Sequence, residues 1–445
     1  MMKTLFLLIV CWIVTGNGYG VFAAVQESPD SSETWSSWRG PTQNGVADPQ
    51  TDPPTEWSEK KNIKSKTPLI GKGHSTPVVW GNQIFVTSAE PVGKKFPAIL
   101  DTAPGAHDNF SVSQQHRFLV SSFDRKNGTL VWQKTLDQVV PHEGGHFTGS
   151  LASASPVTDG KRVFAFFGSH GLYCLDYQGQ LIWKKIIGRM NSKHAHGEGS
   201  TPALQDGVLV VNWDHEGQSF VIAIDAGTGE ILWKVNRPEV TSWSSPIIVK
   251  VDGRYQAVIP GTAATRGYEL QTGKVVWQCG GLSNNVVASP VYEDGIVYVG
   301  SSYDTQSFLA ISLAGAKGDI TESPHVLWHR RRHTPYVPSP LVFRSTLYFF
   351  RHYQGILYRL DGPSGKEKDV FRLPGLTNIY ASPMAAQNRI YIVDRGGRTM
   401  VLDHADQPKI LALNRLNDSF SASPVAVGNE LILRGEKSLY IISAK

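Results

Sequence analysis

The sequence lacks the residues and motifs that mark several common protein classes. It contains only three cysteines in 445 residues, too few for a disulfide scaffold. No two cysteines are adjacent, and the haem-attachment spacing Cys-x-x-Cys-His is absent. The motif Gly-x-Ser-x-Gly, which builds the nucleophile turn of many serine hydrolases, is absent too. The sequence therefore shows no sign of a disulfide-rich domain, a c-type haem protein or a hydrolase of that type.

The chain also has no large excess of positive or negative charge. Lys and Arg number 43 against 38 Asp and Glu, so the formal net charge is only +5. The longest basic run is Arg330–Arg332. Proteins that bind nucleic acid gather Lys and Arg on one face or along one helix. The scattered, mild basicity of this chain therefore argues against nucleic acid as a partner.

A long apolar run occurs only at the N-terminus. Lys3 is followed by the run Leu5–Val14 and then by small residues up to Ala24. This order predicts a secretory signal peptide at residues 1–24, because the run is too short to span a bilayer. Lipid attachment at Cys11 is an alternative that fits less well, since the apolar run continues past it. We expect an exported, periplasmic or extracytoplasmic chain with no transmembrane helix after processing.

Two cysteines remain after removal of the signal peptide. Cys174 and Cys279 lie in different repeats of the chain. We predict buried thiols on strands, because free cysteine is among the most buried residue types. A disulfide between the two is the alternative, since an exported protein meets an oxidising compartment.

What the chain does contain is a repeated Ser/Thr-Pro step. The eight steps are Thr76-Pro77, Ser155-Pro156, Thr201-Pro202, Ser245-Pro246, Ser289-Pro290, Ser339-Pro340, Ser382-Pro383 and Ser423-Pro424. Successive prolines lie 41 to 50 residues apart, except for a first interval of 79. That interval indicates an insertion at about residues 90–116. Short strands at a period of this size predict a propeller.

Each repeat has the pattern of four short strands. Asp-Gly or Gly-Asn pairs follow the first strand and suit tight hairpin turns. A tryptophan follows a glycine by four positions in four repeats, at Trp132, Trp183, Trp233 and Trp277. A large aromatic side chain on the outer strand can be buried between neighbouring blades. We therefore predict an all-β fold, an eight-bladed β-propeller of four-stranded antiparallel blades.

The two ends of the repeat region predict how the ring closes. The last repeat ends after three strands, and the segment that begins at residue 62 has the length of a strand. We expect this N-terminal strand to complete the last blade, which also hides a sheet edge. The expected domains are therefore an N-terminal extension at 25–61 and a propeller at 62–445.

The repeat resembles a known family. The segments "LYCLDYQGQLIWKK" and "VIAIDAGTGEILWKV" are similar to the pyrroloquinoline-quinone (PQQ)-like β-propeller repeat. The segment "WSSWRGPTQNGV" resembles the N-terminal part of exported proteins grouped with the outer-membrane barrel-assembly propeller lipoprotein. Quinoprotein alcohol dehydrogenases are more distant relatives by the same repeat. The resemblance implies envelope proteins or peptides as partners, and it specifies fold more than function.

Histidine, arginine and aromatic residues are concentrated on one predicted face. We call it the loop face: it is formed by the connections that precede each Ser/Thr-Pro step and by those between the second and third strands. The predicted binding residues are His74, His146, His170, His194, His196, Asp214, His215, Trp243, Arg266, Asn285, His333, Tyr336, Arg351, Tyr380 and Arg395. The opposite connections are mostly Asp-Gly, Asn-Gly and Thr-Gly turns. A polar binding surface at the axial mouth is therefore predicted, with the insertion covering part of it.

The residues of this face suggest two kinds of cofactor site, one for a metal and one for a quinone. His194 and His196 lie two residues apart and can point the same way, so they can begin a zinc or iron site that Glu198 and His146 or His215 complete. For a quinone, Trp243 can stack on the cofactor, and the oxygen ligands for calcium would come from Glu198, Asn285 and Asp304. Related dehydrogenases also need an adjacent Cys-Cys pair, and its absence argues against that activity.

These observations lead to three functional hypotheses. The first is an exported, non-catalytic, monomeric propeller that serves as a binding or assembly scaffold for envelope proteins or peptides. The second is an oxidoreductase that depends on PQQ or a divalent metal, which a bound chromophore or metal would reveal. The third is a carbohydrate-binding or sensor module in which Trp243, Tyr336 and Tyr380 stack on a small molecule or glycan.

Overall fold

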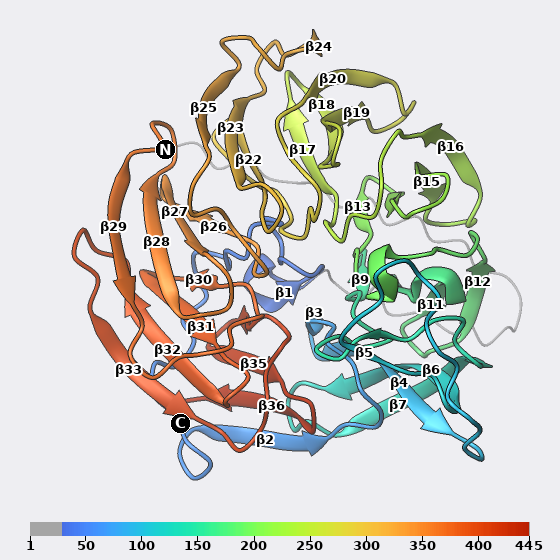
Figure 1. The fold of residues 1–445 in the computed structure, drawn as a ribbon. Coiled ribbons are helices and arrows are strands. Elements are labelled where there is room, and N and C mark those ends of the chain that lie inside the picture. Colours follow the sequence, from blue (N-terminus) through green and yellow to red (C-terminus); the bar gives the residue numbers. More distant parts are fainter. Residues whose placement is uncertain (1–28, 445) are drawn as a thin grey trace, which may run out of the picture.

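The computed structural model describes residues 29–444. The predicted signal peptide at 1–24 and Cys11 lie outside this range. The described chain forms eight antiparallel sheets arranged around a central axis (Figure 1), so the predicted eight-bladed β-propeller is confirmed. Each blade runs from an inner strand beside the axis to an outer strand on the rim, because one small sheet can bury its two apolar faces only between neighbours.

The first four blades contain the following strands, from inner to outer. Blade 1 has β3 (Val78–Trp80), β4 (Gln83–Val92), β6 (Gln115–Asp124) and β7 (Leu130–Val139). Blade 2 has β9 (Val157–Thr158), β10 (Arg162–Phe166), β11 (Leu172–Asp176) and β12 (Leu181–Lys185). Blade 3 has β13 (Ala203–Gln205), β14 (Val208–Trp213), β15 (Phe220–Asp225) and β16 (Ile231–Asn236). Blade 4 has β17 (Ile247–Val251), β18 (Arg254–Ile259), β19 (Thr265–Glu269) and β20 (Val275–Cys279).

The other four blades follow the same order. Blade 5 has β21 (Val291–Glu293), β22 (Ile296–Ser301), β23 (Ser307–Ser312) and β25 (Val326–Arg330). Blade 6 has β26 (Leu341–Phe343), β27 (Thr346–Phe350), β28 (Ile356–Asp361) and β29 (Glu367–Arg372). Blade 7 has β30 (Met384–Ala386), β31 (Arg389–Val393), β32 (Arg398–Asp403) and β33 (Ile410–Arg415). Blade 8 has β34 (Val425–Val427), β35 (Glu430–Arg434), β36 (Ser438–Ser443) and β2 (Ile63–Pro68).

A few short elements lie outside the blade pattern. They are β1 (Thr34–Trp35), β5 (Asn109–Phe110), β8 (Gly145–His146), β24 (Gly318–Asp319) and the 3-10 helices Ser31–Glu33, Gly168–His170 and Lys193–Ala195. The predicted ring closure is confirmed, because β2 pairs antiparallel with β36 and so supplies the outer strand of blade 8. The two ends of the propeller thus share one sheet, as they do at the C label of Figure 1.

The Ser/Thr-Pro steps form a hydrogen-bonded ring around the axis. In each step, the backbone N–H of the Ser or Thr donates to the side-chain hydroxyl of the corresponding residue in the next blade, at 2.8–3.2 Å. Ser155, for example, donates to Thr201 at 3.0 Å and receives a bond from Thr76 at 2.9 Å. The repeat therefore needs a hydroxyl at this position because it satisfies a buried N–H of the neighbouring blade.

The predicted burial of tryptophan between blades is confirmed for all four residues named. Trp132, Trp183 and Trp233 donate their indole N–H to a backbone carbonyl of the next blade at 2.8–3.1 Å, and each packs over a glycine there. Trp277 is also buried between blades, in an apolar cluster that blades 4 and 5 share and that includes Val297 and Leu309, but its hydrogen bond differs. Its ring lies over Gly267 of its own blade and donates to Gln256 at 2.9 Å, because the missing side chain of that glycine leaves room for the indole.

The N-terminal extension closes one end of the central channel. Strand β1 adds to the inner strand β3, which puts this segment at the centre of the ring (Figure 1). Arg39 is fully buried at the axis and donates to the carbonyls of Pro383 at 3.0 Å and Pro340 at 2.9 Å. Asn44 pairs with Tyr292 of blade 5 in the same way. Residues 34–46 therefore act as a plug, a role that the repeat pattern did not reveal.

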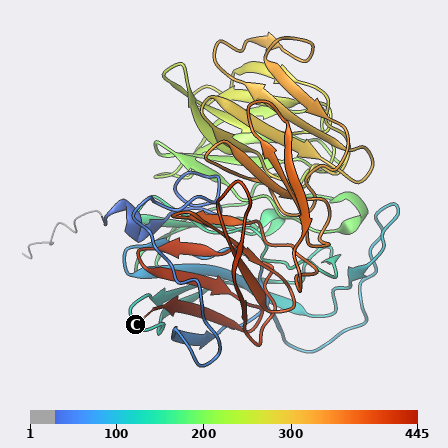
Figure 2. The same cartoon turned by 90° about the vertical axis from the view of Figure 1, so that its left-hand side faces the viewer.

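The insertion lies on the opposite face from the plug. Its flanking strands β4 and β6 are ten residues long and carry the chain beyond the blade, and β5 then pairs with β8 in the connection to blade 2. Figure 2 shows the blue plug on one side of the ring and the light-blue insertion projecting on the other. The insertion therefore covers part of the loop face, as expected.

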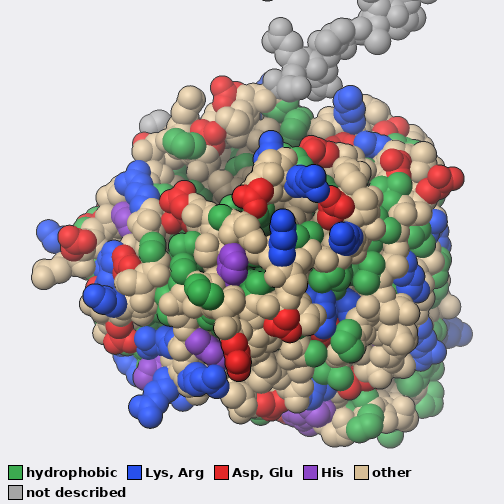
Figure 3. All heavy atoms as spheres, turned by 90° about the horizontal axis from the view of Figure 1, so that it is seen from above, with side chains coloured by type: hydrophobic (Ala, Val, Ile, Leu, Met, Phe, Trp, Pro, Cys, Tyr) green, Lys and Arg blue, Asp and Glu red, His purple; other side chains and the backbone are tan. Residues whose placement is uncertain are grey.

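The two cysteines of the described chain form no disulfide. Cys174 and Cys279 are both buried and free, so the disulfide alternative is wrong. Burial raises the pKa of Cys174 to about 12 and that of Cys279 to about 11, which makes both thiols unreactive at neutral pH. Within residues 29–444, no helix has the length and apolar character needed to cross a bilayer. The outer wall mixes acidic, basic and scattered apolar side chains (Figure 3).

Candidate functional site

A cavity of about 490 Å³ opens at the axial mouth of the loop face. Nine of the predicted binding residues line it: His74, His146, His194, His196, Trp243, Asn285, Tyr336, Tyr380 and Arg395. They come from connections that follow different blades, so the ring brings residues far apart in the sequence to one space. The plug fills the other end of the channel, so this cavity opens toward the loop face.

Two of the other predicted residues are held in buried ion pairs beside the cavity. Asp214 pairs with Arg237 at 3.0 Å, and both side chains are fully buried. Arg266 pairs with the buried Glu239, which also accepts hydrogen bonds from the backbone of blade 4. Buried charges are retained when they are paired in this way. These residues therefore fix the shape of their loops and do not line this cavity.

The remaining four predicted residues also lie outside the cavity lining. The His215 ring accepts hydrogen bonds from the backbone N–H groups of Asn191 and Gly217, both at 3.2 Å. His333 packs on Tyr358 with ring centroids 5.0 Å apart. Arg351 is exposed on the surface next to the cavity.

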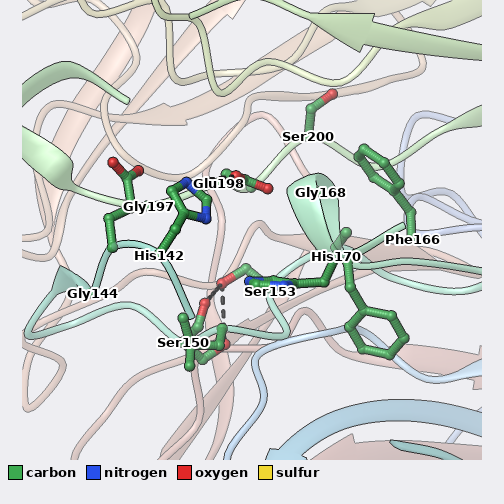
Figure 4. A pocket seen from close by; sticks show the side chains of 15 residues that line it. His142, Gly144, Ser150, Ser153, Phe166, Gly168, His170, Gly197, Glu198 and Ser200 are labelled. Carbon is green, nitrogen blue, oxygen red and sulfur yellow. Dashed lines mark hydrogen bonds and ion pairs between the residues drawn. The ribbon is translucent and has the colours of Figure 1, made fainter. Parts of the chain in front are cut away.

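His170 lies in a smaller chamber under the mouth. Its ring stacks on Phe118 with centroids 4.4 Å apart, and burial lowers its pKa to about 4. The chamber is also lined by His142 and Glu198 (Figure 4). Burial raises the pKa of Glu198 to about 7, although Ser169 donates to its carboxylate from the backbone at 2.7 Å and from the hydroxyl at 2.5 Å. Glu198 thus anchors the blade 2 connection to the cavity wall.

One side of the mouth is built from histidine. His196 lies 4.8 Å from His146, 4.8 Å from His107 and 5.4 Å from His194, measured between ring centroids. His107 belongs to the insertion, which is held here because Asn109 donates to the carbonyl of His194 at 2.8 Å. Burial and the neighbouring His146 lower the pKa of His196 to about 4. This ring is therefore neutral at physiological pH.

The other side of the mouth is built from tyrosine. Tyr303 stacks on Tyr336 with centroids 5.9 Å apart, and Tyr353 stacks on Tyr380 at 5.3 Å. The Arg395 guanidinium lies 4.1 Å above the ring of Tyr380, a cation–π contact. Arg395 also donates to Ser421 at 2.8 Å and to the carbonyl of Thr148, so it joins the tyrosine side to the histidine side.

Several residues that line this cavity have a left-handed backbone conformation. His194, Asn285, Tyr303 and His352 line it, and their φ angles are 58°, 63°, 81° and 55°. Residues other than glycine rarely adopt this left-handed conformation, and such positions cluster at binding sites. The strain supports a functional role for the mouth.

Sequence reasoning missed several cavity residues, among them His107 and Tyr353. His107 lies in the insertion, which has no repeat phase from which its position could be derived. Tyr353 directly follows Arg351 and His352 in "RHYQG" of the connection between β27 and β28. Tyr353 could have been predicted, because its connection joins the second and third strands of a blade and so belongs to the loop face.

The residues suggested for a quinone and its calcium ion do not fit that role. Glu198 is engaged by Ser169, and Asp304 pairs with Lys193 at 3.6 Å. Trp243 donates its indole N–H to the carbonyl of Gly197 at 2.8 Å. Because both carboxylates already have partners inside the protein, they do not form an open oxygen cage for a hard cation. We derive no redox chemistry from this site.

One known protein family matches most of the sequence. The matching family is described as outer membrane protein assembly factor BamB, and the matches span residues 116–369 and 217–445. The chain belongs to this BamB family. No curated protein matches this BamB-family chain.

Solved structures show the same fold. BamB from Moraxella catarrhalis aligns with a TM-score of 0.55 and 15% identity, over 79% of this chain and 100% of that one. Quinohemoprotein alcohol dehydrogenase from Comamonas testosteroni aligns with a TM-score of 0.50 and 10% identity, over 94% and 81%. The computationally designed protein Ika8 aligns with a TM-score of 0.50 and 12% identity, over 80% and 98%. At these identities the likeness shows a shared fold and identifies no ligand.

Proposed function

We propose that this BamB-family chain is an exported, monomeric scaffold that binds an extended segment of an envelope protein at its axial mouth, without catalysis. The description of its family as an outer membrane protein assembly factor supports a protein partner. The enclosed shape of the mouth and its mixed aromatic and polar lining are typical of binding sites.

The observation that carries this proposal is where the exposed aromatic side chains lie. Phe147, Tyr303 and Tyr353 are 59%, 65% and 39% exposed, and within residues 29–444 they are the large aromatic side chains that face solvent most openly. All three belong to the loop face. Leu100 of the insertion is 75% exposed. Apolar side chains gathered at a rim mark an interaction surface, because leaving them in water costs free energy.

The form of the ligand follows from the shape of the channel. The plug around Arg39 closes the far end, so a chain cannot thread through the ring. An extended segment can instead lay alternate side chains into the cavity and against the tyrosine pairs, while its backbone stays free for polar contacts. Arg395 places positive charge at the same opening, which favours a segment with an acidic residue.

Site-specific photo-crosslinking tests the proposal. A photo-reactive phenylalanine analogue at Tyr303 is expected to capture unfolded outer-membrane barrel proteins, supplied as purified probes, through the mouth. The matched control position is Leu411, an exposed residue of the outer strand β33. Equal capture at the two positions, or none at Tyr303, would overturn the proposal. The variant Tyr303→Ala/Tyr353→Ala should weaken binding at least tenfold, because aromatic anchors carry much of the energy of such interfaces.

A glycan is a second candidate ligand. The exposed ring of Tyr303 lies next to Asp304 and Lys193, so a stacking surface and polar groups occur together, as sugar recognition requires. A glycan array with the same double tyrosine variant separates the two functions. Saturable sugar binding that the variant abolishes, with no capture of barrel proteins, would favour the glycan.

A further inference from the structure

The plug bonds to the inner strands of several blades at one recurring position. This position is the second residue after the proline of each Ser/Thr-Pro step. In blade 2, Thr158 donates its N–H to the Ser36 carbonyl at 2.9 Å. In blade 7, Ala385 donates to the Gly45 carbonyl at 2.9 Å and accepts from the Ala47 N–H at 2.8 Å. The backbone N–H and C=O of this position therefore point toward the axis, away from the next strand of their own blade.

In two blades the partner of this position is a side-chain amide. Gln43 Oε1 accepts from the N–H of Ile248 in blade 4 at 2.9 Å, and Gln43 Nε2 donates to the Ile248 carbonyl at 3.0 Å. Asn44 forms the same two bonds with Tyr292 in blade 5, at 2.8 Å and 2.5 Å. A primary carboxamide carries an acceptor and donors side by side, so it can satisfy both backbone groups at once. This position of the repeat therefore already binds a carboxamide twice.

Blade 3 offers the same position without a partner from the plug. Its residue is Leu204 in the inner strand β13, which lies between β9 and β17 beside the axis (Figure 1). Between residues 29 and 444, no segment outside blade 3 forms a hydrogen bond with Leu204. The reason is a turn in the plug, where the Gly40 N–H donates to the Ser37 carbonyl at 3.0 Å. This turn directs Arg39 toward blades 6 and 7, away from blade 3.

A pocket of about 100 Å³ lies between this turn and blade 3. Leu204 lines it together with Trp38, Pro202 and Pro246, which give it apolar walls. Trp38 and Leu204 are half-buried, so the pocket can be reached from the side of the ring that carries the plug. Apolar walls around a few directed polar groups are typical of sites for small ligands. We call this space the plug pocket.

We propose that the plug pocket binds a primary carboxamide, which pairs with the N–H and C=O of Leu204 as Gln43 pairs with Ile248. The group can belong to an Asn or Gln side chain of a partner protein or to a small free amide. A carboxylate of the same shape has no donor at neutral pH, so it cannot form both bonds. The plug pocket and the axial mouth lie on opposite faces of the ring, so this inference and the proposed function can each fail alone.

Saturation-transfer NMR with three small probes tests the inference on the processed chain. Benzamide should bind with a Kd of about 1 mM, the range expected for a ligand of this size. Benzoate and N,N-dimethylbenzamide keep the aromatic ring but lack the N–H donors, so they should bind at least tenfold more weakly. Equal binding of the three probes, or no binding of benzamide, would overturn the inference.

Two substitutions of Leu204 separate its backbone from its side chain. Leu204→Pro removes the N–H, and because that N–H points away from β14, the proline breaks no bond of the blade. Benzamide should bind this variant at least tenfold more weakly. Leu204→Ala keeps the N–H and is the matched control, with an affinity within about threefold of the wild type. Equal affinities of the two variants would contradict the assigned bond.

Circular dichroism and thermal melts show whether each variant is folded. If Leu204→Pro does not fold, Trp38→Ala takes its place. It removes one wall of the plug pocket and should also weaken benzamide at least tenfold. The exposed Leu411→Ala on β33 is its control and should bind benzamide as the wild type does. Unchanged affinity in Trp38→Ala would place the amide elsewhere and overturn the inference.

A pair of peptides distinguishes the two sources of the carboxamide. Both are extended pentapeptides with an acetyl group and a methylamide at their ends, and they differ only in a central Gln or Glu. Tighter binding of the Gln peptide than of benzamide would identify a protein side chain as the ligand, and weaker binding would identify a small free amide. Equal binding of the Gln and Glu peptides would count against a carboxamide site.

Discussion

The backbone N–H of Ser423 donates to the hydroxyl of Thr76 at 3.1 Å, across 347 residues of sequence. This bond joins blade 8 to blade 1 at the axis, while β2 and β36 join them at the rim. The ring is therefore closed twice, by one hydroxyl in its centre and by one strand at its edge. Neither contact exists until the whole chain has folded.

Removing one hydroxyl from the axial ring should destabilise the fold. In Thr76→Val the buried N–H of Ser423 loses its acceptor, which costs about 1–3 kcal/mol in the free energy of unfolding. Ser245→Ala should cost a similar amount, since the same bond forms inside the ring at 2.8–2.9 Å. Urea denaturation measures both. The exposed Ser111→Ala is the control and should change stability by less than about 0.5 kcal/mol.

Two glycine substitutions separate the effect of overpacking against a tryptophan from the effect of backbone strain on stability. Gly229 and Gly207 share a φ of 75°, but a methyl group on Gly229 would lie 2.7 Å from Trp183, whereas nothing lies within 4 Å of one on Gly207. Gly207→Ala should therefore cost about 1–2 kcal/mol through strain alone. Gly229→Ala should cost a further 1–3 kcal/mol or so through overpacking. Equal unfolding midpoints for the two variants would contradict this assignment.

The buried guanidinium of the plug should be a major determinant of stability. Arg39→Met removes bonds to the carbonyls of Pro340, Pro383 and Asn44, and leaves those oxygens buried without their donor. The expected loss is about 2–4 kcal/mol, because hydrogen bonds to charged groups are the strong ones. Arg254→Met is the control, as its guanidinium is exposed and should contribute less than about 1 kcal/mol. A thermal melt in which both variants match the wild type would refute this role.

His170 should make stability depend on pH. Its folded-state pKa of about 4 lies below the usual value of 6.5, because burial disfavours the charged ring. As the pH falls from 6.5 to 4 the unfolded chain takes up this proton first, so the free energy of unfolding decreases by roughly 2 kcal/mol. Below pH 4 this loss is complete.

The variant His170→Gln isolates that contribution. It carries no titrating ring, so its stability relative to the wild type should improve as the pH is lowered from 7.5 to 4.5. His170→Phe keeps an aromatic ring against Phe118 and should behave in the same way. Urea denaturation at the two pH values measures the difference. A constant gap between variant and wild type would show that His170 does not titrate in this range.

Local patterns were enough to predict the blade. Ser/Thr-Pro steps, Asp-Gly turns and alternating strands are short-range features, and their period fixed the number of blades and the shared eighth sheet. Trp277 is buried between blades like the others but differs in its hydrogen bond, because its indole N–H meets Gln256 in the space above Gly267, which the period does not encode. Of the predicted site residues, His146 and Tyr380 line the cavity at the mouth. Asp214 does not line it and instead forms a buried ion pair with Arg237.

The sequence by itself determined the ring, because every blade repeats the same local rules and a ring of such blades buries their apolar faces. Only the tertiary structure decided what fills and covers that ring. The plug at Arg39 and the insertion at His107 follow no repeat, so their positions depend on contacts between residues far apart in the chain. The physical reason is that the repeat specifies how neighbouring blades pack, whereas the plug and the insertion are segments outside the repeat, so their positions depend on tertiary contacts.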